Sequence, residues 1–256
     1  LVLTAAHVEH AMASVPESNF VQFGLVVDPD GGGTAIAGST ALAPVRNGFA
    51  RGLDLAVVLL KDPIPSSDAT PVPILHSDSA EYIDDAEAMT AGYGDRENVR
   101  GALEFDLTTA LDGVVPKDDN SIRKGNRTLR TRACPPESRI PECKHLEGLY
   151  HYVPLLQNGA TMPLTACEND SGSGAFVQTE GINGRLAVSA IFAVAHRREN
   201  LDDVCAEQML FTDITAPDTQ AKLRAAIASL DPGVDVDSLF ISGELRRLPR
   251  LASAGQ

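Results

Sequence analysis

Three short segments of the chain supply a histidine, an aspartate and a serine, in that order. They are His7 at the end of the run LTAAH, Asp54 at the start of DLAVVLL, and Ser171 within NDSGSG. A serine hydroxyl is a poor nucleophile at neutral pH, so it needs a base within hydrogen-bond reach, and that base needs a carboxylate to orient it. A chain that uses these three side chains together must bring distant parts of its sequence to one place.

This order resembles that of the trypsin/chymotrypsin family of serine proteases, because subtilisin and the α/β-hydrolases arrange the three residues differently. The interval from His7 to Asp54 is close to that of the chymotrypsin template, whereas the interval from Asp54 to Ser171 is longer. The longer interval indicates extra sequence between the acid and the nucleophile. Two further runs match the family: GYG (92–94) resembles the Gly-Trp-Gly that opens its second barrel, and QMLFTDI (208–214) resembles its last strand.

The resemblance predicts an all-β fold of two antiparallel β-barrels with a C-terminal α-helix. It assigns residues 1–95 to the first barrel, with its N-terminal strands missing because only six residues precede the histidine. Residues 96–230 are assigned to the second barrel, which carries an insertion around 113–160 and the helix. Residues 231–256 exceed the usual end of the family and are expected to be a tail or linker.

The helix is also indicated by the residues themselves. Pro217 is favourable in the first turn of a helix. Leu223, Ile227 and Leu230 then recur at helical spacing and form one apolar stripe. The turn signal DPG at 231–233 is expected to end the helix.

The catalytic roles follow from the resemblance. Ser171 would attack the acyl carbonyl, His7 would take the serine proton, and Asp54 would hold the imidazole in the right tautomer. The backbone N–H groups of Asn169 and Ser171 would form the oxyanion hole. The family has glycine in place of Asn169, and asparagine tolerates positive φ better than most residues. Asp170 corresponds to the partner of the α-amino group that zymogen cleavage releases.

Four residues correspond to the family's substrate pocket or to its support: Thr165, Ala193, Ala195 and Met209. Thr165 stands where trypsin has an aspartate, so the pocket floor would carry no negative charge. Ala195 and Met209 stand at two wall glycines and would narrow the pocket, and Ala193 replaces a serine that supports the catalytic aspartate. The resemblance therefore predicts a preference for small, uncharged residues on the acyl side of the cleaved bond.

Four cysteines allow three disulfide pairings. The resemblance implies that Cys167 pairs with Cys205, which leaves Cys134 and Cys143 for the second bridge. Disulfides form in oxidising compartments, so a secreted or periplasmic protein is expected. A zinc site is the alternative use of two of these cysteines, with the ligands Cys134, Cys143, His145 and His151, although their spacing matches no standard zinc finger.

The charge and hydropathy of the chain bear on its partners. A net charge of −14 argues against binding to a nucleic-acid backbone. No run of about 18 apolar residues occurs, so no membrane span is expected. Protein or peptide substrates are the expected partners, neither a cofactor nor a metal is implied, and the sequence does not indicate the oligomeric state. A basic run at 123–132 is either a solvated loop or a docking site.

Two functions remain in competition. The first is a secreted serine endopeptidase, made as a zymogen, that works through an acyl-enzyme. The second is a catalytically inactive homologue that acts as a protein-binding module, which Asn169, Ala193 and the altered pocket favour and the complete His-Asp-Ser set disfavours. A metalloprotease is disfavoured because the chain has no His-Glu-x-x-His motif, and an α/β-hydrolase because Ser171 lacks the Gly-x-Ser-x-Gly elbow.

Overall fold

A computed structural model describes most of residues 1–82, nearly all of the segment 171–196, the segment 208–245 and three further strands between residues 87 and 154. The described residues are 1–14, 20–21, 33–46, 49–67, 69–82, 87–92, 124–132, 149–154, 171–180, 185–196 and 208–245. Their helices are α1 (Ala6–Ala13), α2 (Pro217–Leu230) and two short 3-10 helices, Ser77–Tyr82 and Asp237–Leu239. Their strands are β1 (Val2–Thr4), β2 (Phe20–Val21), β3 (Thr34–Ala41), β4 (Val45–Arg46), β5 (Phe49–Ala50), β6 (Ala56–Leu60), β7 (Ile74–Leu75), β8 (Glu87–Gly92), β9 (Lys124–Arg132), β10 (Leu149–Pro154), β11 (Gly174–Gln178), β12 (Leu186–His196), β13 (Gln208–Asp213) and β14 (Phe240–Ile241).

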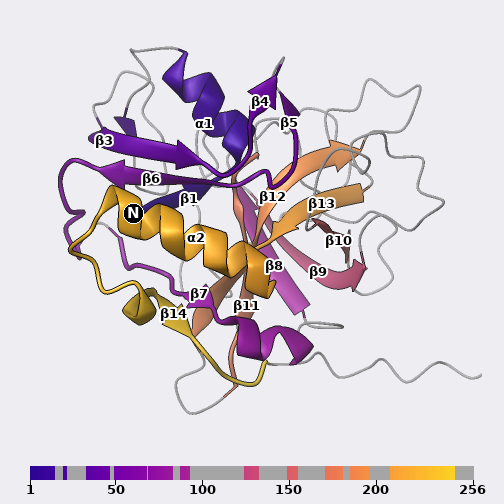
Figure 1. Cartoon of the computed structure of the whole chain (residues 1–256). Coiled ribbons are helices and arrows are strands. Elements are labelled where there is room, and N and C mark those ends of the chain that lie inside the picture. Colours follow the sequence, from indigo (N-terminus) through magenta and orange to yellow (C-terminus); the bar gives the residue numbers. More distant parts are fainter. Residues whose placement is uncertain are drawn as a thin grey trace, which may run out of the picture.

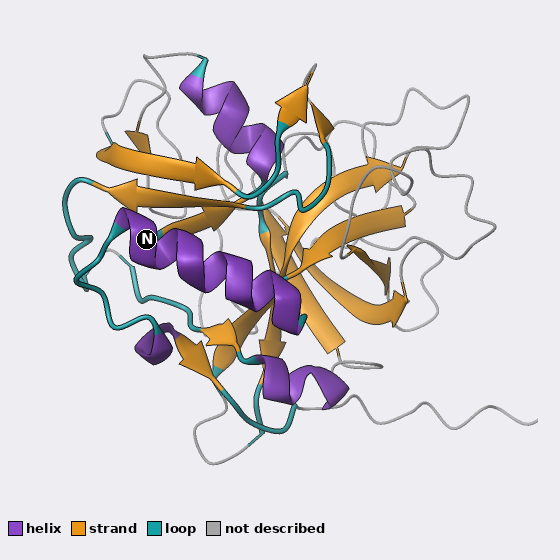
Figure 2. Ribbon diagram, viewed as in Figure 1, coloured by secondary structure: helices purple, strands orange, loops and turns teal. Residues whose placement is uncertain are grey.

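The first sheet has four strands in the order β1-β6-β3-β2, and its neighbours are antiparallel. Its central strand β6 has the sequence AVVLL and is buried on both faces, as a continuous apolar run predicts. Strand β3 alternates between half-buried and exposed positions, which is the pattern of a strand with one solvated face. A separate pair, β4 and β5, packs beside α1 (Figure 2). Ala6, Ala43 and Ala50 form a small hydrophobic cluster there.

The larger sheet has eight strands in the order β11-β8-β9-β10-β13-β12-β7-β14, and β11 pairs with β12 as well as with β8. Its pairs are antiparallel except at β7, which runs parallel to both β12 and β14. Pro73 immediately precedes β7, and Pro71 lies two residues before Pro73. Because proline has no N–H to donate to a ladder, the strand itself contains only Ile74 and Leu75, and Pro73 contributes only its carbonyl, which accepts from the Val188 N–H over 2.9 Å.

The prediction of an all-β fold with two antiparallel β-barrels is wrong. The structure is a mixed α/β fold, with an open first sheet, a larger sheet that includes parallel pairs, and two α-helices. Closing a sheet into a barrel requires a partner for both of its edge strands. Within the described part of the chain, β1 and β2 each pair with one neighbour only, so the first sheet does not close.

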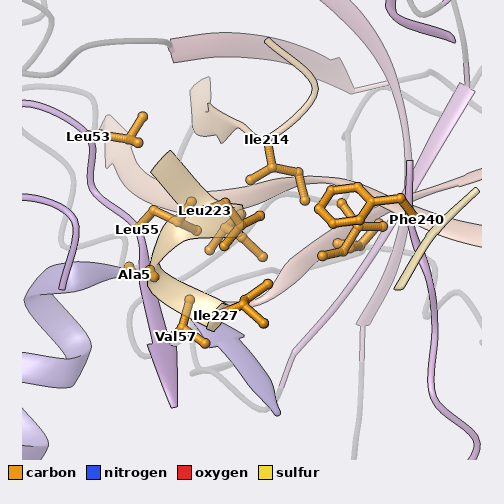
Figure 3. Packing of buried hydrophobic residues seen from close by; sticks show 12 residues of the cluster. Ala5, Leu53, Leu55, Val57, Ile214, Leu223, Ile227 and Phe240 are labelled. Atoms are coloured by element: carbon orange, nitrogen blue, oxygen red, sulfur yellow. The ribbon is translucent and has the colours of Figure 1, made fainter. Parts of the chain in front are cut away.

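Helix α2 is the helix expected from Pro217, and it ends at Leu230. It lies across the junction between the two sheets (Figure 1). Its buried residues Leu223 and Ile227 pack with Leu55, just before β6, with Val57 of β6 and with Ile214 beyond β13 (Figure 3). The same cluster includes Val188 and Ile191 of β12. One hydrophobic core therefore joins both sheets and the helix.

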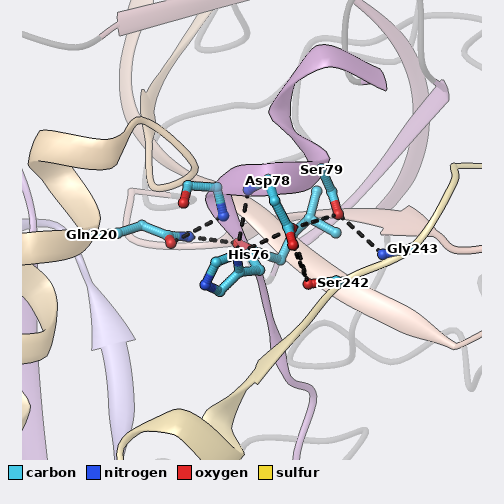
Figure 4. A network of polar contacts seen from close by, with 8 residues as sticks. His76, Asp78, Ser79, Gln220, Ser242 and Gly243 are labelled. Atoms are coloured by element: carbon cyan, nitrogen blue, oxygen red, sulfur yellow. Dashed lines mark hydrogen bonds and ion pairs between the residues drawn. The ribbon is translucent and has the colours of Figure 1, made fainter.

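Residues 231–245 lie within the region expected to be a tail or linker, and they pack back onto the fold. Phe240 contributes to the junction core, and Leu245 is 2% exposed in the core of the larger sheet. A network of polar contacts holds the same segment: the Ser242 hydroxyl donates to the Asp78 carboxylate, and the Gly243 N–H donates to the Ser79 hydroxyl (Figure 4).

Candidate functional site

Asp54 lies in a tight turn just before β6. The Leu55 N–H donates to the Leu53 carbonyl over 2.8 Å, so Asp54 is the central residue of a γ-turn. Both flanking leucines are buried in the junction core, which fixes the turn, and Asp54 itself is 1% exposed. A buried carboxylate must be hydrogen-bonded to remain charged, so its partners decide what the site can do.

His7 supplies those partners. Strand β1 pairs with β6 in a register that places Thr4 opposite Ala56, and the chain turns at the extended residue Ala5 into α1. His7 therefore sits in the first turn of a helix, where backbone N–H groups have no intrahelical acceptor. Its N–H donates to Asp54 Oδ1 over 3.0 Å, and its ring Nδ1 lies 2.8 Å from Asp54 Oδ2.

This arrangement orients the imidazole. An ionised carboxylate only accepts hydrogen bonds, so this contact favours the tautomer in which the Nδ1 atom facing Asp54 carries the proton. The other ring nitrogen, Nε2, is then free to accept a proton from a neighbour. The His7 side chain is 21% exposed and that of Asp54 only 2%, so the carboxylate is the shielded member of the pair. A histidine held in this way is equipped to act as a general base.

Ser171 lies in the turn that leads into β11, and hydrogen bonds tie this turn to β12. The Gly172 N–H donates to the Phe192 carbonyl over 2.9 Å, and the Phe192 N–H donates to the Ser173 carbonyl over 2.7 Å. Gly172 has a φ of +88°, a conformation that L side chains rarely adopt. The turn is therefore fixed on both sides of Gly172 and requires glycine there.

The serine turn packs against the segment that carries His7. A Cβ atom added to Gly172 would overlap the Thr4 hydroxyl oxygen and lie 3.3 Å from the Ala5 nitrogen. Residue 172 is thus in direct contact with the residues that precede α1. No hydrogen bond joins Ser171 to His7 in the described part of the chain. The structure brings His7 and Asp54 into contact and places the Ser171 turn beside them.

The other expected site residues are described in part. Ala193 is 2% exposed and lies where the β12–β13 register shifts, between Phe192 and Val194. Ala195 of β12 lies opposite Met209 of β13, so the two expected wall positions are cross-strand neighbours. Outside the described residues lie Thr165, Asn169, Asp170, the four cysteines Cys134, Cys143, Cys167 and Cys205, and His145 of the alternative zinc site. The disulfides and the oxidising compartment stay predictions.

Thr212 is a site residue that sequence reasoning missed. Its side chain is fully buried in β13, and its hydroxyl donates to the backbone carbonyl of Asp54 over 3.0 Å. A threonine in an apolar strand is an ordinary β-sheet residue, so no sequence pattern indicates this contact. It links the larger sheet directly to the Asp54 turn that precedes β6.

A second polar cluster lies away from this pair. It contains His76, whose Nδ1 is 3.0 Å from Asp78 Oδ1, together with Ser79 and Ser242 (Figure 4). The hydrogen bond from Ser242 lowers the pKa of Asp78 below its ordinary value, and the neighbouring His76 acts in the same direction. Asp78 is more than half exposed, so this cluster is a surface contact that holds residues 240–243 in place.

Neither a metal centre nor a membrane-spanning helix is found in the part of the chain that the structure describes. No three His, Cys, Asp or Glu side chains there are grouped so as to hold a metal ion. None of the helices there is long and apolar enough to cross a membrane.

No model of a known protein family matches the chain, and no curated protein matches it significantly. The interpretation of the site therefore rests on its residues and their geometry.

Proposed function

We propose that this protein is a serine endopeptidase that uses His7, Asp54 and Ser171. The observation that carries the proposal is the His7–Asp54 pair, in which a buried carboxylate accepts from both the backbone N–H and the ring Nδ1 of one histidine. The contact of Gly172 with Thr4 and Ala5 supports the inclusion of Ser171. The chain order of the three residues, which is that of the trypsin/chymotrypsin family, supports it as well.

The proposed reaction has two halves. In the first, Ser171 Oγ bonds to the peptide carbonyl carbon while His7 Nε2 takes the hydroxyl proton, and the same proton then passes to the departing amine. In the second, water loses a proton to His7 and attacks the acyl carbonyl, and the proton returns to Ser171 as the acid product leaves. Asp54 stabilises the imidazolium that forms in each half. The backbone N–H groups of Asn169 and Ser171 are the proposed donors to the oxyanion.

The proposed substrates have a small, uncharged residue on the acyl side of the cleaved bond. Thr165 offers no anion to a lysine or arginine side chain, and burying such a charge without a partner is costly. In the register of β12 with β13, Ala195 lies opposite Met209, so the two expected wall positions come from adjacent strands. A cleavage profile over a peptide library dominated by lysine or arginine would contradict this specificity.

A fluorophosphonate probe tests the nucleophile directly. In the labelling reaction Ser171 Oγ bonds to phosphorus, fluoride leaves, and His7 takes the proton. We expect the parent protein to be labelled and Ser171→Ala to be unlabelled, with peptidase activity lost in the same variant. Ser173→Ala is the matched control, because it removes a hydroxyl two residues away in the same turn and should leave labelling intact. Equal labelling of the parent and Ser171→Ala would refute the proposal.

A second candidate function is a binding module that has kept the His-Asp pair without turnover. The absence of a Ser171–His7 hydrogen bond, within the residues that the structure describes, favours it. Catalytic hydrogen bonds are often long in structures without substrate, so the endopeptidase remains the stronger proposal. A folded parent protein that resists the probe would support the binding module instead.

A further inference from the structure

The hydroxyl of Thr212 joins the two sheets at the catalytic turn. It comes from β13 of the larger sheet and donates to the carbonyl of Asp54, which lies 158 positions earlier in the chain. Thr212 is fully buried and Asp54 nearly so. A hydrogen bond between two buried groups cannot be replaced by water without opening the core, so this contact is persistent.

The γ-turn explains why Asp54 needs such a partner. The hydrogen bond that closes the turn joins Leu55 to Leu53 and does not involve the carbonyl of Asp54. That carbonyl faces the protein interior, where an unpaired acceptor is destabilising. The Thr212 hydroxyl satisfies it and thereby restrains the backbone from which the catalytic carboxylate extends.

On β12, the strand beside β13, the position that the family resemblance assigns to a supporting serine offers no side-chain hydrogen-bond donor. Ala193 of β12, where the family resemblance expects a serine that supports the aspartate, is buried and has no hydroxyl. Thr212 lies on the adjacent strand, opposite Ile191. The support for Asp54 from the larger sheet therefore reaches its backbone carbonyl instead of its carboxylate.

We infer that Thr212 is a positioning residue for the catalytic pair: its hydroxyl holds the Asp54 turn so that the carboxylate meets His7 in the orientation that leaves Nε2 free. The inference rests on the proposed function, because it assigns Thr212 a role in the same reaction. Thr212 contacts neither the substrate nor the reacting atoms, so it acts through Asp54. Its loss should lower kcat, while substrate binding, which does not involve this turn, should change little.

The test compares three variants of the full chain, with a fourth held in reserve. Thr212→Val keeps the shape and removes the donor, and we expect kcat to fall about tenfold to a hundredfold, with KM within about twofold of the parent. Thr212→Ser restores the hydroxyl and should recover most of kcat. Thr179→Val is the matched control, because it removes another buried threonine hydroxyl that donates to a backbone carbonyl, that of Arg185, away from the site. If Thr212→Val does not fold, Thr212→Cys takes its place. Its thiol is a weaker hydrogen-bond donor than a hydroxyl, so kcat of Thr212→Cys should be lower than that of Thr212→Ser.

A spectroscopic signature separates this inference from the proposed function. The Nδ1–H proton that His7 shares with Asp54 should give a low-field NMR resonance, assigned by its loss in His7→Gln. We expect Thr212→Val to broaden or abolish this resonance and Thr179→Val to preserve it. This measurement needs no turnover, so it tests Thr212 even if Ser171→Ala retains activity and the endopeptidase proposal fails. An unchanged resonance together with an unchanged kcat in Thr212→Val would overturn the inference.

Discussion

The contact between Gly172 and Thr4 gives the sharpest test of how the serine turn is held beside His7. We predict that Gly172→Ala destabilises the fold by about 2–4 kcal/mol, which is the sum of two separate effects. Gly172 has a φ of +88°, where an alanine costs about 1 kcal/mol or somewhat more. The new methyl group also overlaps the Thr4 hydroxyl, and relieving an overlap in a packed site costs about 1–3 kcal/mol.

Gly52→Ala is the matched control because it separates the two effects. Gly52 also has a positive φ, +108°, but a Cβ atom there would meet its nearest neighbour, the Ala43 Cβ, at 3.9 Å. This substitution introduces backbone strain without overlap and should cost only about 1 kcal/mol. The free energy of unfolding of each variant is measured by urea titration.

A double-mutant cycle with Thr4→Ala isolates the overlap. Removing the Thr4 hydroxyl eliminates the nearest colliding atom, so Gly172→Ala should cost about 1–3 kcal/mol less in the Thr4→Ala background. Under the proposed function, Gly172→Ala should also lower peptidase activity, and Thr4→Ala should restore part of it, because the serine turn then no longer has to move away from the His7 segment. If Gly172→Ala costs no more than Gly52→Ala and its coupling to Thr4→Ala is zero, the serine turn does not pack against Thr4 in solution.

Two further predictions concern stability. Leu223→Ala removes a fully buried side chain of α2 from the junction core and should cost about 2–5 kcal/mol in urea unfolding, whereas Leu239→Ala, half-buried at the edge of the same cluster, should cost clearly less. Ser242→Ala removes the hydrogen bond that lowers the pKa of Asp78. A carboxyl group whose folded-state pKa is depressed stabilises the fold above its unfolded value of 3.8 and loses that contribution as the pH falls. The difference in Tm between the parent and Ser242→Ala should therefore shrink from pH 7 to pH 3, whereas Ser238→Ala, whose hydroxyl donates to a backbone carbonyl, should show the same difference at both pH values.

The local features that the sequence predicted well depend on short-range chemistry. The apolar run 56–60 forms the buried strand β6, and the Pro217 signal with its apolar stripe forms α2. The contact of His7 with Asp54 is not local, because 47 positions separate the two residues: only the family resemblance suggested that they meet, and in the structure the pairing of β1 with β6 brings them together. The register of this pairing matters, because a one-residue slip between β1 and β6 would separate the two side chains.

The fold class was not predictable from the same patterns. A two-residue strand such as β7 has no periodicity to detect, yet its parallel pairing with β12 and β14 gives the larger sheet its mixed character. Residues 231–245 exceed the resemblance, so nothing in it indicated that Phe240 and Leu245 complete two hydrophobic clusters. The Thr212–Asp54 hydrogen bond spans 158 positions, and single-sequence patterns carry no information about such a contact.

The two halves of the candidate site differ in how they are held. The His7–Asp54 pair is built within the first sheet, by the pairing of β1 with β6 and the helix turn that follows it. Ser171 arrives from the larger sheet, and its alignment depends on contacts that cross between the sheets: Gly172 against Thr4, and Thr212 to Asp54. A packed core has discrete arrangements and transmits small displacements, so a change at the Gly172–Thr4 contact should move the proposed nucleophile relative to His7, whereas a change at the Thr212–Asp54 contact should also disturb the His7–Asp54 pair. Under the proposed function, the rate of peptide cleavage is therefore the quantity most sensitive to the junction, because proton transfer from Ser171 requires the two halves to meet within hydrogen-bond distance.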